Sequence, residues 1–178
     1  MRYPEGHKEE TRARIVEAAS RALRREGLAG VSVPALMKRA GLTHGGFYGH
    51  FRDRDALVCE AVAFAAGETA EALFERAPDL ASAVEVYLSQ AHLDHPERGC
   101  VLAALGSEAR QQPAPVRAAF AKAARGFIEG VARRLGGKPS PTDEALALAS
   151  RLVGALVLAR LVDDPHLAGR LLEAARRP

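Results

Sequence analysis

The sequence predicts an all-α protein, and three observations carry that prediction. Alanine, leucine, arginine and glutamate dominate the 178 residues, while aromatic residues make up only 5%. No stretch alternates polar and apolar residues over the length of a strand. Apolar residues instead recur three and four positions apart, which is the spacing of one helix face, through most of the chain. We therefore expect helices throughout, in one or two small domains.

The first predicted helix runs from about Glu9 to Glu26. It carries one apolar stripe, formed by Ile15, Ala18, Ala19, Ala22 and Leu23. Gly27 follows at the position where a helix commonly ends in a left-handed residue, so we expect the helix to stop there.

Three shorter helices are predicted next. Ser32 is a candidate N-cap for a helix that ends near 40–41, with Pro34 tolerated in its first turn. Thr43 would cap a third helix over 44–51, in which Phe47 and Phe51 share a face. Asp53 would cap a fourth helix that ends before the break at 77–79.

The rear of the chain predicts longer helices. We expect one over about 80–94, because the residue before Pro96 resists helical geometry. Others are expected over 100–110, from the Pro113/Pro115 break to about 135, over 142–161 and over 165–177.

The positive charge is concentrated at the front of the chain. Residues 1–54 hold eleven Lys and Arg against six Asp and Glu, whereas residues 55–178 hold fourteen against sixteen. The net charge of +3 therefore hides a basic front segment, which favours a polyanionic partner for that segment alone.

Several classes of protein are excluded by the same sequence. The longest apolar run, 152–159, is eight residues, far short of the ~20 that a membrane helix needs. No secretory signal opens the chain, and Cys59 and Cys100 do not make a disulfide scaffold, so we expect a cytoplasmic protein. No motif of an enzyme, cofactor site or metal site is present; His92 and His95 lack a third ligand nearby.

The most informative segment is residues 32–54. Two short helices joined by a tight turn at 40–43 have the spacing of a helix-turn-helix, whose second helix enters the DNA major groove. That second helix contains Gly45, Gly46 and Gly49, which together cost about 3 kcal/mol of helix propensity relative to alanine. Such glycines are useful where the backbone must approach another molecule closely, and a phosphate backbone is the candidate.

Residues 41–54, GLTHGGFYGHFRDR, resemble the recognition helix and following cap of the tetracycline-repressor (TetR/AcrR) family of bacterial transcription regulators. About ten positions match in order, and the preceding helix lies at the matching distance. The resemblance implies an N-terminal three-helix helix-turn-helix DNA-binding domain at 8–56. It also implies a helical-bundle domain at 57–178 that binds a ligand and dimerises.

The resemblance also assigns roles to single residues. Thr43 would cap the recognition helix and contact phosphate, while His44 and Gly46 would face base edges. As a neutral ring that donates and accepts once each, His44 is the candidate for sequence readout. Arg54 stands where the family commonly has lysine, and would still bind phosphate. The candidate DNA-binding residues are Ser32, Lys38, Arg39, Thr43, His44, Gly45, Gly46, Tyr48, His50, Arg52 and Arg54.

A dimer and an effector are implied for the rear domain. The helix over 142–161 has an apolar stripe wider than a small monomeric core needs, although a purely intramolecular core is the alternative. The candidate dimer contacts are Leu146, Leu152, Val153, Leu156 and Leu171. The candidate effector contacts are Tyr87, Cys100, Leu102, Phe120, Phe127 and Val131. Each of these also fits a plain core position, and their chemistry favours an apolar or aromatic effector.

Cys100 allows a sharper hypothesis. It follows Gly99 at a helix start, where the helix dipole favours a thiolate. The segment GCVLAALGSEAR is similar to one in electrophile-sensing members of the family, in which a cysteine at the matching place reacts. A buried, inert cysteine is the alternative for Cys100 and the expectation for Cys59.

These observations together predict a ligand-responsive transcriptional repressor. It would bind a palindromic operator in double-stranded DNA as a homodimer and be released by a small apolar or electrophilic effector. The alternative is a helical protein–protein adaptor that does not bind DNA. The presence of hydrogen-bond donors around the 44–51 helix favours the repressor.

Overall fold

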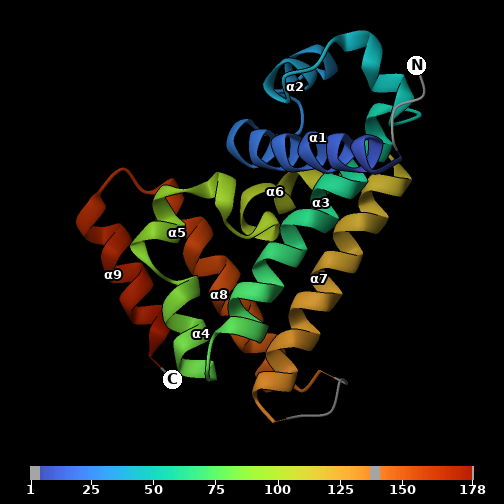
Figure 1. Cartoon of the computed structure of the whole chain (residues 1–178). Coiled ribbons are helices and arrows are strands. Elements are labelled where there is room, and N and C mark those ends of the chain that lie inside the picture. Colours follow the sequence, from blue (N-terminus) through green and yellow to red (C-terminus); the bar gives the residue numbers. More distant parts are fainter. Residues whose placement is uncertain (1–4, 137–140, 178) are drawn as a thin grey trace.

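The computed structural model describes residues 5–136 and 141–177, and this part of the chain is helical without any strand (Figure 1). The elements are α1 (Glu5–Glu26), α2 (Val33–Arg39), the 3₁₀ helix η1 (His44–Gly49), α3 (Arg54–Ala70) and its π-helical continuation η2 (Glu71–Arg76), α4 (Leu80–Tyr87), α5 (Gln90–Asp94), the 3₁₀ turn η3 (Pro96–Arg98), α6 (Val101–Ala109), α7 (Ala114–Arg134), α8 (Asp143–Leu161) and α9 (Pro165–Arg176). The all-α prediction is confirmed.

Helix ends follow the local chemistry of the sequence. Gly27 closes α1 with φ +83°, and Gly41 turns the chain between α2 and η1 with φ +73°. Both values lie in the left-handed region that glycine adopts without strain. Side chains of Ser32 and Asp53 accept hydrogen bonds from the first turns of α2 and α3, as expected of N-caps.

Two predicted helices are wrong in type or length. The segment predicted as an α-helix over 44–51 is a 3₁₀ helix over 44–49, and its glycines explain the loss of regular α-helical winding. The helix predicted over 80–94 is two helices. It breaks for two reasons. The Tyr87 carbonyl accepts a hydrogen bond from the His92 ring at 2.6 Å, and the Ser89 side chain caps the start of α5.

The buried side chains form two clusters that meet along α3, α6 and α7. The front cluster joins α1, α2, η1 and the first half of α3 to Val101, Leu105 and Phe120. The rear cluster joins the second half of α7 to α4, α8 and α9. Figure 1 shows α1 lying across the upper ends of α3 and α6, with α2 on its far side. The domain division at residue 56 stays a prediction, and α3 runs through it without a break.

Arg24 of α1 holds the front of the chain to the rear through a buried guanidinium. Its side chain is 1% exposed and pairs with Glu68 of α3 at 2.6 Å. It also donates to the Gly99 carbonyl at 2.6 Å and to the Ser20 carbonyl at 3.2 Å. A buried charge is tolerable only when it is paired and hydrogen-bonded in this way.

None of the described helices is long and apolar enough to cross a membrane.

Replacing Arg24 with alanine is predicted to lower the free energy of unfolding by about 3 kcal/mol, because it removes the partner of Glu68 and of the Gly99 carbonyl. Urea denaturation measures the loss. Arg25→Ala is the matched control, since the Arg25 side chain is 63% exposed and lies 3.6 Å from Glu97; it is expected to change stability by less than about 0.5 kcal/mol. Equal losses in the two variants would contradict the assigned role of Arg24.

Candidate DNA-binding surface and ligand cavities

The α2–η1 unit is anchored by two aromatic side chains. Phe47 and Phe51 are 1% and 2% exposed, and their rings stack with centroids 5.6 Å apart. They pack in the front cluster with residues of α1 and α3. The anchors face inward, so the opposite face of η1 is left exposed.

Neither crowding nor backbone conformation requires glycine at the three glycine positions of η1. A Cβ added at Gly45 or Gly49 would meet no atom of the described chain within 4 Å, and one at Gly46 would make only ordinary contact with Met37 at 3.7 Å. None of the three has a positive φ. The backbone of η1 is therefore open to the outside at these positions, which is compatible with the close approach of another molecule.

Exposed polar groups surround this backbone. Tyr48 is 68% exposed and meets the Phe47 ring edge-on, with centroids 5.2 Å apart. Lys38 is exposed at the end of α2. Thr43 occupies the N-cap position of η1, but its side chain makes no capping hydrogen bond. The side chain of His44 lies outside the described part of the structure, so its predicted contact with base edges stays a prediction.

The arginines predicted to bind phosphate have partners within the chain. Arg39 pairs with Glu26 at 2.8 Å, and Arg52 pairs with the adjacent Asp53 at 2.7 Å. Arg54 donates one N–H to the Leu28 carbonyl. A guanidinium carries five N–H groups, so each arginine keeps donors for a second partner.

Arg12 is a residue that the sequence interpretation missed. It lies on α1, donates to the His50 carbonyl at the end of η1, and pairs with Glu60 of α3. Its guanidinium also stacks 4.3 Å from the centroid of the Phe51 ring. Arg12 thus fixes the end of η1 to both α1 and α3.

His50 itself is half-buried, and its Nδ1 has no hydrogen-bond partner in the described structure. Burial and the nearby charges of Lys8 and Arg12 lower the pKa of its imidazole. The ring is therefore neutral in the unbound protein at pH 7, and an approaching phosphate would favour its protonation.

The rear of the chain contains two adjoining cavities. The first is about 580 Å³ and lies between α3, α6 and α7; among the predicted effector contacts, Cys100, Leu102 and Phe127 line it. The second is about 270 Å³ and lies between α3, α4, α5 and the start of α6, lined by Tyr87 and Cys100. Thr69 and Cys100 belong to the walls of both.

The remaining predicted contacts lie elsewhere. Phe120 lines a separate cleft between α6 and α7, and Val131 is 1% exposed within the rear cluster. The large contribution of α3 was not predicted. It supplies Cys59, Glu60, Ala63, Ala66, Gly67, Thr69 and Ala70 to the first cavity. Its run of small residues was the available signal, because short side chains leave space beside a helix.

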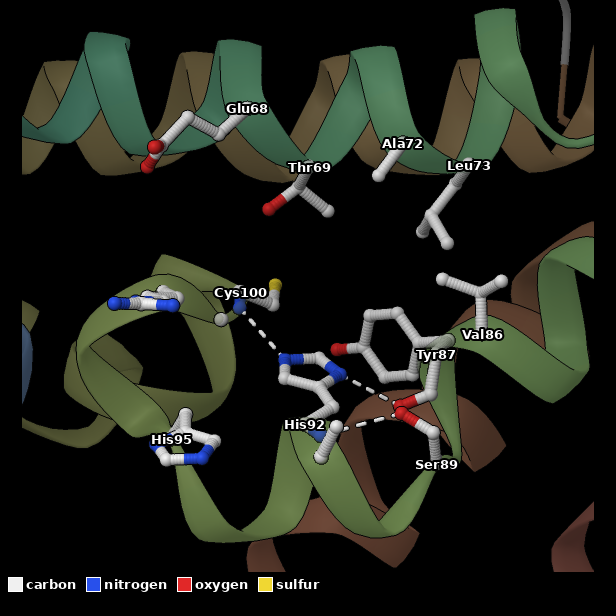
Figure 2. A pocket seen from close by; sticks show the side chains of 13 residues that line it. Glu68, Thr69, Ala72, Leu73, Val86, Tyr87, Ser89, His92, His95 and Cys100 are labelled. Carbon is white, nitrogen blue, oxygen red and sulfur yellow. Dashed lines mark hydrogen bonds between the residues drawn. The ribbon is translucent and has the colours of Figure 1, made fainter.

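Figure 2 shows the surroundings of Cys100 in the second cavity. Cys100 is 2% exposed and is the N-cap residue of α6. Its backbone N–H donates to His92 Nε2 at 2.8 Å, and His92 Nδ1 donates to the Tyr87 carbonyl at 2.6 Å. The imidazole therefore accepts at one nitrogen and donates at the other, which requires the neutral ring. Burial lowers the pKa of His92 to about 4.

Four of the candidate dimer contacts fall on two sides of α8, and the fifth, Leu171, lies on α9. Leu152 and Leu156 are 3% and 0% exposed in the chain's own core, so their side chains are not available to a second copy. Leu146 is 39% exposed, and Val153 and Leu171 are partly buried. The outer side of α8 also exposes Leu158 and Leu161, at 52% and 74%, which the sequence interpretation left out.

These features define a helix-turn-helix protein whose rear bundle encloses cavities of ligand size. Residues 15–61 match the sequence profile described as "Bacterial regulatory proteins, tetR family". The match covers the second half of α1, all of α2 and η1, and the start of α3. No curated protein sequence matches the chain.

Solved structures share the fold over nearly the whole chain. NemR of E. coli in its reduced form is 22% identical, with a TM-score of 0.74 over 94% of this chain and 93% of that one. A TetR-family regulator from Cytophaga hutchinsonii is 21% identical, with a TM-score of 0.76 over 96% and 93%. A TetR regulator from Chloroflexus aurantiacus is 20% identical, with a TM-score of 0.74 over 96% and 92%. The front of the chain therefore matches the TetR-family profile, and the chain as a whole shares the fold of solved TetR-family regulators.

The neutral His92 predicts a pH-dependent stability. The unfolded chain takes up a proton at this ring near pH 6.5, whereas the folded chain does so only at about pH 4. The contribution of the neutral His92 ring to the free energy of unfolding is therefore complete above pH 6.5. It is lost as the pH falls from 6.5 towards 4, by up to about 3 kcal/mol. Urea denaturation of the wild type and of His92→Gln over this range measures the difference between the two. His166→Gln, at an exposed position, is the control; parallel curves for wild type and His92→Gln would refute the prediction.

Proposed function

We propose that the protein is a ligand-responsive repressor that binds operator DNA as a homodimer and is released by a small effector. The observation that carries this proposal is the exposed backbone of η1, which holds glycines that the fold itself does not need. Exposed donors on α2 and η1 lie beside it. A helical adaptor without DNA binding is the alternative, and it gives no reason for this combination.

The DNA-binding surface would consist of Ser32, Lys38, Arg39, Thr43, His44, Gly45, Gly46, Tyr48, His50, Arg52 and Arg54. Phosphate contacts from hydroxyl, guanidinium and backbone N–H groups would set the position of η1 in the major groove. Gly45 and Gly46 would let the backbone come close to the duplex, and His44 would read base edges.

The dimer would form through the outer side of α8 together with α9. Leu158 and Leu161 are exposed on α8, and Leu167 is 40% exposed at the start of α9. A row of apolar side chains of this kind favours contact with a second copy. Leu146, Val153 and Leu171 would contribute at its edges. The resulting two-fold axis would match a palindromic operator with half-sites about one helical turn apart, or a multiple of it.

The effector would occupy the cavity of about 580 Å³ between α3, α6 and α7. Five alanines, two phenylalanines, Val101 and Leu102 form the apolar part of its wall, which suits an apolar molecule. The same cavity gives a small electrophile access to the Cys100 thiol. Glu60 lies in this wall and pairs with Arg12. An effector that displaces Glu60 would therefore loosen the hold of Arg12 on the His50 carbonyl at the end of η1.

Substituting Gly45 with alanine is expected to raise stability and weaken DNA binding at once. Alanine gains up to about 1 kcal/mol of helix propensity, and its methyl group meets no atom of the described chain within 4 Å. The same methyl group would stand between the backbone and the duplex, and we expect affinity to fall about tenfold. Fluorescence anisotropy with a duplex of random sequence, at several salt concentrations, measures binding, and thermal melting measures stability.

Gly106→Ala is the matched control for this experiment. Gly106 lies on α6 with open space at its Cβ, so alanine should stabilise the helix and leave DNA binding unchanged. Unchanged binding in Gly45→Ala would contradict the close approach at η1. Absence of any salt-dependent binding by the wild type would favour the adaptor.

Filling the first cavity is expected to block the effector without affecting DNA binding. Gly126 of α7 lines the cavity, and a Cβ added there meets nothing within 4 Å. In Gly126→Leu the side chain would occupy the space, so the affinity for the apolar fluorescent probe N-phenyl-1-naphthylamine should drop at least about tenfold. The same substitution at Gly106, outside this cavity, should leave probe binding unchanged. Equal probe binding by Gly126→Leu and the wild type would place the probe, and the proposed effector, elsewhere.

A further inference from the structure

The second cavity contains a buried hydroxyl that the proposed function does not use. We propose that this cavity binds a small uncharged molecule whose carbonyl or ether oxygen accepts a hydrogen bond from the Tyr87 hydroxyl. The site is separate from the apolar cavity between α3, α6 and α7, and binding to it can be measured without DNA or an effector.

Tyr87 ends α4 and is 1% exposed. Its hydroxyl is buried and has no nitrogen or oxygen partner among the described residues; the polar group beside it is the Cys100 thiol, which is only a weak acceptor. Figure 2 shows the hydroxyl directed towards Cys100, below Thr69. Buried hydroxyls are nearly always hydrogen-bonded, because an unpaired one loses its bond to water without replacement. An unpaired donor in a cavity wall therefore indicates a ligand that carries an acceptor.

Neighbouring polar groups hold the phenol in place but do not satisfy it. The His92 ring meets the Tyr87 ring edge-on, with centroids 4.8 Å apart, and both of its nitrogens are hydrogen-bonded to the backbone. The Thr69 hydroxyl donates to the Ala65 carbonyl at 3.1 Å. Glu68 is paired with Arg24 at 2.6 Å. These three groups are committed to the protein, whereas the Tyr87 hydroxyl is not.

The groups around the Tyr87 hydroxyl favour an uncharged ligand, and the charged Arg98 of the same wall is exposed to solvent. Burial and the adjacent Cys100 raise the pKa of the Tyr87 phenol, so the hydroxyl stays protonated and donates. His92 is neutral at pH 7, and the charge of Glu68 is compensated by Arg24. A charged ligand would lose its hydration without gaining an ion pair at the Tyr87 end of the cavity.

The size and lining of the cavity set the scale of the molecule. An apolar cavity of ~150 Å³ can hold benzene, so about 270 Å³ is sufficient for a substituted aromatic ring. Ala72, Leu73 and Val86 supply apolar contacts around the Tyr87 hydroxyl. We therefore assign an aromatic ketone or a compound of similar size and polarity as the class of ligand.

A ligand here would also touch the link between the two ends of the molecule. Glu68 and Gly99 line this cavity, and both are hydrogen-bonded to Arg24 of α1. Gly99 has no room for a side chain, because a Cβ there would overlap the His92 ring. The backbone just before α6 is thus fixed by the His92 ring on one side and by Arg24 on the other.

The test compares two probes that differ by one acceptor. Acetophenone carries a carbonyl oxygen, and α-methylstyrene replaces it with a methylene group of nearly the same shape. We expect the full-length wild type, titrated by calorimetry or protein NMR, to bind acetophenone about tenfold more tightly. In Tyr87→Phe this preference should disappear while both probes still bind. Its melting temperature should be unchanged or raised, because the substitution removes only an unpaired hydroxyl.

Two further variants locate the binding. Ala72→Leu would fill the second cavity and should abolish binding of both probes, whereas Gly126→Leu would fill the first cavity and should leave their binding unchanged. Four results would overturn the proposal: no acetophenone binding up to its solubility, equal affinity of the wild type for both probes, a preference that persists in Tyr87→Phe, or binding that is lost in Gly126→Leu. If Tyr87→Phe does not fold, the probe preference of the wild type and the two cavity-filling variants still decide the question.

Discussion

The buried guanidinium of Arg24 is the interaction on which the arrangement of the molecule depends. It reaches from α1 to α3 and to the backbone just before α6, and its charge is balanced by Glu68. Burying an arginine costs several kcal/mol unless every partner is in place. The position of α1 is therefore tied to Glu68 and Gly99. Because α1 also packs against α2 in the front cluster, a displacement of α1 at this contact would also displace the proposed DNA-binding surface.

The second constraint is that η1 cannot hold its own shape. Its glycines make it a poor helix, so it depends on side chains that reach it from other elements. Phe47 and Phe51 anchor it from below, and Arg12 fixes its last carbonyl to α1 and α3. η1 thus has a low intrinsic helix propensity, but side chains of other elements fix its position. This combination suits a surface whose backbone must contact a DNA duplex closely. It also makes that surface sensitive to movements of α3.

Local chemistry allowed the sequence to predict most of the fold. Caps such as Ser32 and Asp53, and the left-handed Gly27, act within a few residues, so they can be recognised without tertiary structure. The break after Tyr87 could not be predicted in this way, because it depends on the orientation of the His92 ring towards a carbonyl and the start of α6. The cavities were located only in part, since α3 was not expected to line them. Burial of Leu152 and Leu156 likewise depends on how α8 packs against its neighbours.

Helix α3 presents two carboxylates, roughly two turns apart, to two different chambers. Glu60 borders the apolar chamber and holds Arg12, while Glu68 borders the chamber of Tyr87 and holds Arg24. Chemically unlike molecules can therefore disturb the same pair of helices through separate ion pairs. Under the two proposals above, a ligand in either chamber would be sufficient to act on α1, and the two ligands would not need to resemble each other. The ligand specificity of one chamber could therefore change during evolution while a ligand in the other chamber still acts on α1.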